Sequence, residues 1–146
     1  MNKLYTCAWL CLAASYVSGA MAQAPVLIIK DAWVRQTPGS DVAAVYLNLR
    51  NTSARPVIVI GVRSPAASHA TIHETAVVGG QSQMRMYEKL IIAPGQTTSF
   101  APGGLHIMLS GLKQNMSVEK SVPLVLLLAD GGQVSVAALV KPLTAY

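Results

Sequence analysis

LVLLLADGGQVSVAAL, residues 124–139, is the stretch that most clearly predicts a local fold. Its turn sequence, Asp130-Gly131-Gly132, separates two apolar runs and is the strongest hairpin signal in the chain. The run 124–128 is apolar on both faces, as expected of a strand with neighbours on both sides. This stretch therefore predicts a β-hairpin whose first strand is central in a sheet.

The remaining sequence has the same character, because short alternating or β-branched runs recur and no stretch carries a sustained helical stripe. Gly-, Pro- and Asn-containing turns separate these runs at 37–39, 51–53, 79–80, 94–95 and 102–104. We expect ten strands, at 26–30, 32–36, 42–50, 56–62, 71–77, 84–92, 97–101, 106–110, 124–129 and 134–139. Short strands with one buried face need a second layer to cover them, so we predict a single all-β domain, a Greek-key β-sandwich over residues 25–146.

The first 24 residues have the pattern of a secretory signal peptide. Lys3 precedes an uncharged apolar run, and small residues at Ala22 and Ala24 follow it. Cleavage is expected after Ala24, with Ala22 as the alternative. The apolar run is shorter than the roughly 20 residues that a spanning helix needs, so we predict a soluble, exported, periplasmic protein without a stable membrane span.

Both cysteines, Cys7 and Cys11, lie inside this predicted signal. The mature chain then has no thiol for disulfides, thiolate catalysis or thiolate metal sites. Removal of Lys3 leaves a net charge of +4 instead of the +5 of the full chain. The basic residues are scattered singly and aromatic residues are few, which argues against nucleic acid as a partner.

Histidine and methionine are concentrated in one window of the sequence. The histidines are His69, His73 and His106, and the methionines after the signal are Met84, Met86, Met108 and Met116. His106 and Met108 are one residue apart in an expected strand, so both side chains leave the same face. His73 and Met84 flank the Gly79-Gly80 turn, so a hairpin brings their strands side by side.

Two imidazoles and two thioethers suit Cu(I), a soft ion that prefers sulfur to carboxylate. Zinc fits less well, because its sites recruit Cys, His or carboxylate. Neutral thioether ligands release a metal more readily than thiolates, which favours a carrier. Met86 leaves the same face as Met84 and is an open substitute for it, while His69 is an additional imidazole that is a candidate for Cu(II) or for a plain surface role.

The spacing His73, ten residues, Met84, twenty-one residues, His106, one residue, Met108 resembles that of the periplasmic copper chaperones of the PCu(A)C family. The surroundings are similar too, including Ala32-Trp33-Val34-Arg35, the stretch 46–51, His73-Glu74-Thr75 and the stretch 102–113. The resemblance implies a cupredoxin-like β-sandwich that binds one Cu(I) and delivers it to a partner. The implied acceptor is subunit II of cytochrome c oxidase, during assembly of its binuclear copper centre, sometimes with a thiol-containing co-chaperone.

Other functions have less support in the sequence. A copper storage or resistance protein would use the same ligands, but one open site per chain holds little metal. A metal-free exported binding module would use the methionines as an adaptable apolar patch. An enzyme is not expected, because blue-copper sites need a Cys ligand and the acidic residues form no constellation with a nucleophile.

Overall fold

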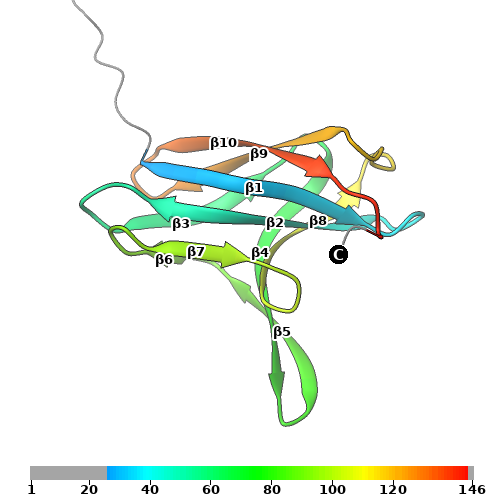
Figure 1. Cartoon of the computed structure of the whole chain (residues 1–146), viewed down its shortest axis with the longest axis horizontal. Helices are drawn as coiled ribbons and strands as arrows, with labels where there is room; N and C mark the ends of the chain where they lie inside the picture. The colour runs from blue at the N-terminus through cyan, green and yellow to red at the C-terminus, as the bar shows by residue number, and fades with distance from the viewer. Residues whose placement is uncertain (1–25, 145–146) are drawn as a thin grey trace, which may run out of the picture.

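The computed structural model describes residues 26–144. The predicted signal peptide, residues 1–24, and both cysteines lie outside the described residues. Within the described chain no helix is long and apolar enough to cross a membrane. The described residues form ten strands, labelled in Figure 1: β1 (Leu27–Gln36), β2 (Val42–Asn51), β3 (Val57–Arg63), β4 (Ala67–Val78), β5 (Gln81–Tyr87), β6 (Leu90–Ile92), β7 (Thr97–Phe100), β8 (Leu105–Leu112), β9 (Ser121–Leu128) and β10 (Gln133–Val140).

The prediction of an all-β chain is confirmed, and its two layers belong to one continuous sheet. The strand order is β5-β4-β8-β2-β1-β10-β9-β3-β6, with β7 paired to β2. Buried residues from β1, β2 and β8 form one cluster with buried residues from β3, β9 and β10. The sheet must therefore fold over so that its two halves pack face to face, with this cluster between them.

The hairpin at residues 124–139 is confirmed. Strand β9 pairs antiparallel with β10, and β3 lies on its other side, so β9 is a central strand. The side chain of Asp130 stabilises the turn, because its Oδ1 accepts a hydrogen bond from the backbone N–H of Gly132 at 2.9 Å. This local contact is the Asx-type bond that Asp commonly makes in turns.

In two places the expected division into strands is wrong. The runs 26–30 and 32–36 form the single strand β1, in which an irregularity between Lys30 and Trp33 shifts the register against β2. Asp31 has a φ of 54° there, a left-handed conformation that Asp tolerates better than most residues. The expected strand 84–92 is instead divided into β5, which pairs with β4, and β6, which pairs with β3. Its apolar residues therefore belong to two strands that pair with different neighbours, β4 and β3.

Strand β4 begins at Ala67, four residues before the expected start. Its early residues pair with the end of β8, as in Ala67 with Leu112 and His69 with Ser110. At its other end β4 joins β5 in a hairpin that projects away from the body of the sheet (Figure 1). The turn consists of Gly79 and Gly80, both with positive φ, which is the two-residue geometry that matches strand twist.

Asn51, at the end of β2, forms hydrogen bonds with the β2–β3 connection and with β6. Its side chain is fully buried. Its Nδ2 donates to the carbonyl oxygens of Arg55 at 2.7 Å and Ile92 at 2.9 Å, and its Oδ1 accepts from the backbone N–H of Ser53 at 2.9 Å and from the Ser53 hydroxyl at 2.8 Å. A buried amide with all these partners is satisfied, so it anchors the β2–β3 connection to β6.

Candidate metal centre

The four predicted ligands lie on one outer face of the sheet, on strands β4, β5 and β8. In the antiparallel ladder of β4 and β8, His73 is directly opposite His106, and Thr71 is directly opposite Met108. Residues that are opposite in such a ladder share a face, as do residues two apart in one strand. The core faces of these strands instead carry buried Ile72, Ile107 and Leu109.

His106 has one ring nitrogen in a hydrogen bond with the backbone. It is 7% exposed, and its Nδ1 is 3.0 Å from the carbonyl oxygen of Gly104. A carbonyl only accepts, so Nδ1 carries the proton and Nε2 keeps a free lone pair. A backbone carbonyl that orients an imidazole in this way is the usual support for a metal-binding histidine.

His73 lies beside His106, with the ring centroids 5.9 Å apart. Its Nε2 is 2.9 Å from the hydroxyl oxygen of Thr71, whereas its Nδ1 is buried and has no hydrogen-bond partner. Burial lowers the pKa of His73, and the charge of His106 lowers it further. The ring is therefore neutral at pH 7 and has an unsatisfied buried nitrogen, a condition that a bound ligand would relieve.

The methionines complete the donor set on this face. Met84 is 58% exposed, Met86 is 56% exposed, and Met108 is partly buried. A shallow groove of about 290 Å³ is lined by Met84, His106 and Met108, with Tyr46 and Arg35 also on its wall. The groove therefore contains three of the four predicted ligands. The fourth, His73, lies beside them because it is opposite His106.

The hairpin brings the strands of His73 and Met84 together as predicted, but the residue directly opposite His73 is Met86. Met84 is opposite Thr75, one step closer to the turn on the same face. Sequence reasoning missed this register although a signal was present. Counting outward from a two-residue Gly79-Gly80 turn pairs 78 with 81 and hence 73 with 86.

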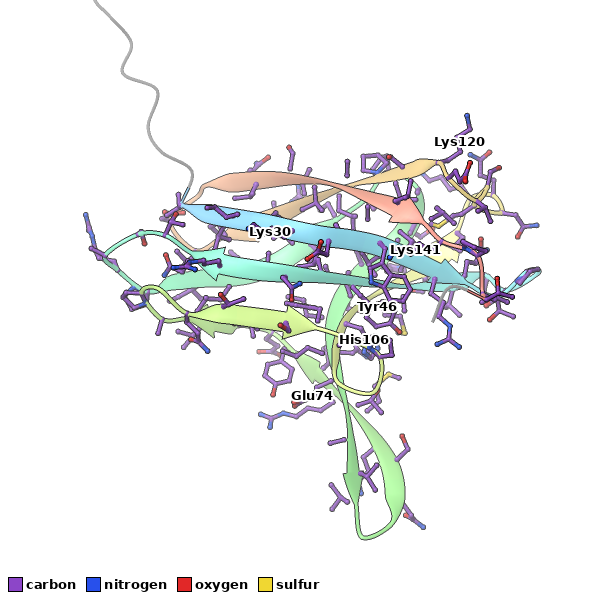
Figure 2. All side chains as sticks on the ribbon, viewed as in Figure 1. Lys30, Tyr46, Glu74, His106, Lys120 and Lys141 are labelled. Atoms are coloured by element: carbon purple, nitrogen blue, oxygen red, sulfur yellow. The ribbon has the colours of Figure 1, made fainter. Side chains whose placement is uncertain are left out.

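Sequence reasoning also missed Tyr46, which supports the site from β2. Its ring centroid is 6.4 Å from that of His106 and 4.5 Å from that of Trp33. Figure 2 shows Tyr46 and His106 on the same side of the sheet, with Glu74 near the start of the projecting hairpin. Burial raises the pKa of Tyr46, and the charge and hydrogen bond of Arg35 partly oppose that rise. The sequence carries no signal for this role, because Tyr46 reaches the site only through the pairing of β2 with β8, in which Ala44 is opposite Met108.

The two remaining candidates are placed differently. His69 is exposed and lies on the same outer face, opposite Ser110, four residues along β4 from His73. Met116 is partly buried against the core, and its backbone N–H donates to Oε1 of Gln36 at 2.7 Å. Met116 therefore fills space in the core, the role that buried methionine has most often.

The donor set has a clear chemical preference. Across residues 26–144 there is no group of three or more His, Cys, Asp or Glu side chains placed to hold a metal. A site on this face must combine imidazole nitrogen with thioether sulfur, which suits a soft monovalent ion better than zinc, calcium or magnesium.

Comparisons with known proteins cover most of this chain. The family model described as LpqE-like matches residues 27–140. A protein of Leifsonia xyli subsp. xyli, named as a candidate lipoprotein, Lxx21020, is 36% identical over 120 residues, which cover 82% of this chain and 72% of the relative.

Solved structures match as well. The solution structure of CuI-DR1885 from Deinococcus radiodurans is 33% identical with a TM-score of 0.67, covering 87% of this chain and 85% of that one. The copper-bound PCuAC domain from PmoF2, at 22% identity, shares the fold with a TM-score of 0.66, covering 80% of this chain and 93% of that one. The predicted cupredoxin-like fold is thus confirmed. These matches show that the chain belongs to the LpqE-like family and confirm its resemblance to the PCu(A)C copper chaperones.

Proposed function

We propose that this protein is a metallochaperone that binds one Cu(I) through His73, Met84, His106 and Met108. The observation that carries the proposal is the β4–β8 register, which puts two imidazoles opposite each other beside the thioether groove. The structure of a relative 33% identical to this chain is described as its Cu(I) form, which supports the choice of metal.

The arrangement suits binding followed by release. His106 offers Nε2 without rearrangement, whereas His73 must exchange its Thr71 contact for the metal if it binds through Nε2. All four ligands are neutral, so an acceptor can displace them one at a time without leaving a buried side-chain charge unpaired. Met84 is more than half exposed, so an acceptor can reach the metal from solvent.

The proposed place of action is the periplasm, where the predicted signal peptide directs the chain. The name of the Leifsonia relative, a candidate lipoprotein, agrees with export. The proposed acceptor is subunit II of cytochrome c oxidase, the partner implied by the family resemblance, with a thiol-containing co-chaperone as a further participant. The protein acts in this proposal as a carrier and not as an enzyme.

A Cu(I) titration of the chain beginning at residue 25 tests the proposal. Native mass spectrometry is expected to find one copper per chain, retained in competition with a chelator of known affinity. The loaded protein is then mixed with the apo soluble domain of oxidase subunit II, and transfer of copper is expected. Absence of stoichiometric copper would contradict the chaperone function and favour a metal-free binding module, while binding without transfer would favour storage.

Copper affinity is expected to fall on acidification, because a protonated imidazole nitrogen cannot bind a metal. Ordinary histidines titrate near pH ~6.5. Burial lowers the pKa of His73. Protons therefore compete with copper for this imidazole only below the ordinary histidine value, and not at neutral pH. Competition titrations from about pH 8 down to about pH 5 should show an affinity that is flat at first and then decreases. The His73→Met variant should show a shallower decrease, and a flat profile for the parent would contradict histidine ligation.

A further inference from the structure

Met86 is a soft donor beside the proposed site that the four-ligand set does not use. It is directly opposite His73 in the β4–β5 ladder, just as His106 is directly opposite His73 in the β4–β8 ladder. The three residues therefore form one row across β5, β4 and β8 on the outer face. Directly opposite side chains have Cβ atoms roughly 5 Å apart, so the sulfur of Met86 has His73 within its reach.

Met84 and Met86 occupy different parts of the surface. Met84 lines the groove that contains His106 and Met108, whereas Met86 lines a separate open hollow formed by residues 85–89. Both side chains are more than half exposed. Methionine is unbranched with three rotatable bonds, so a change of rotamer can move its sulfur between the hollow and His73 without disturbing the backbone.

The outward position of Met86 is set by the sheet order. Strand β5 is the last strand of the sheet, and in the described chain it has a hydrogen-bonded neighbour on one side only, β4. Along this free edge the side chains of Met84 and Met86 are more than half exposed, whereas the ring of His106 is mostly buried. Met84 and Met86 are both on this edge strand, so each lies closer to the open edge than His73, His106 and Met108 do.

We propose that Met86 is a fifth, exchangeable copper ligand that takes the place of Met84 beside His73 during release. The inference rests on the proposed function. In the exchange the bond from copper to the sulfur of Met84 breaks as the bond to the sulfur of Met86 forms. Copper remains Cu(I), both thioethers are neutral, and no proton or electron moves. Five donors for an ion that takes three or four allow this substitution without a bare intermediate.

A double-mutant cycle with Cu(I) and a competing chelator tests the exchange. Leucine is close to methionine in volume and apolar, so it removes sulfur while preserving the exposed surface. We expect Met86→Leu to weaken binding less than about threefold, Met84→Leu about tenfold, and the double variant more than about 300-fold, because each thioether covers for the loss of the other. Dissociation of copper to the chelator should also be slower in Met86→Leu than in the parent.

A second readout uses Ag(I), a redox-inert soft monovalent probe, with NMR of methyl-labelled methionine. One equivalent is expected to shift the methyl signals of both Met84 and Met86, and to leave that of Met116 unchanged. Met116→Leu is the matched control in the chelator assay and should bind copper as the parent does. If only Met84 shifts and the double variant equals Met84→Leu, Met86 is not a ligand and the chaperone function stands. If the parent holds no Cu(I), the proposed function itself fails.

Discussion

Replacement of His106 by alanine is expected to abolish stoichiometric Cu(I) binding. His106 is the most buried of the four proposed ligands, and its Nδ1–H bond to Gly104 leaves only Nε2 for the metal. Loss of a supporting hydrogen bond around a metal site lowers affinity 10–100-fold, so loss of the ligand itself should exceed about 100-fold. Competition with a Cu(I) chelator, followed optically, measures the change.

The control for this variant is His69→Ala. His69 is also on the outer face of β4, but it is exposed and four residues along the strand from His73, so copper affinity should be unchanged. Circular dichroism of both variants checks that the sheet is intact, since His106 is buried beside Tyr46. Copper binding by His106→Ala at the strength of the parent would remove the basis of the proposed site.

Replacement of Asn51 by leucine is expected to give a large loss of stability with no direct effect on copper. The change leaves the buried carbonyl of Ile92 and the partly buried N–H of Ser53 without their hydrogen bonds to the Asn51 side chain. Each unsatisfied buried group costs about 1–3 kcal/mol, so the free energy of unfolding should fall by about 3 kcal/mol or more. Urea unfolding measures this change, and the melting temperature should fall by roughly 10 °C.

The matched comparison is Ser53→Ala, which removes one hydroxyl of the same network. It should cost only about 1 kcal/mol, because the Asn51 amide keeps its bonds to Arg55, Ile92 and the Ser53 backbone. Asn51 is five residues, or about 17 Å along β2, from Tyr46. Folded Asn51→Leu should therefore bind copper as the parent does, and equal stability of the two variants would contradict the anchoring role.

The local sequence predicted a strand well where the whole run of residues pairs with a strand next to it in the sequence. The stretch 124–139 carries its own turn, so its hairpin follows from short-range chemistry. The stretch 84–92 did not follow, because its two parts pair with β4 and β3, which lie far apart in the strand order. An apolar run in the sequence does not show that its first part pairs with one strand and its second part with another.

The same distinction between local sequence and tertiary structure applies to the candidate metal site. Period-two spacing by itself determined that His106 and Met108 share a face, and residue types determined the preference for a soft ion. The Gly79-Gly80 turn likewise contained the pairing of His73 with Met86, since a two-residue turn sets the register of its hairpin. Only the tertiary structure decided that His73 is opposite His106 and that Tyr46 supports the ring. Those contacts depend on which distant strands lie side by side, and that is settled by burial of the shared core, which no local pattern records.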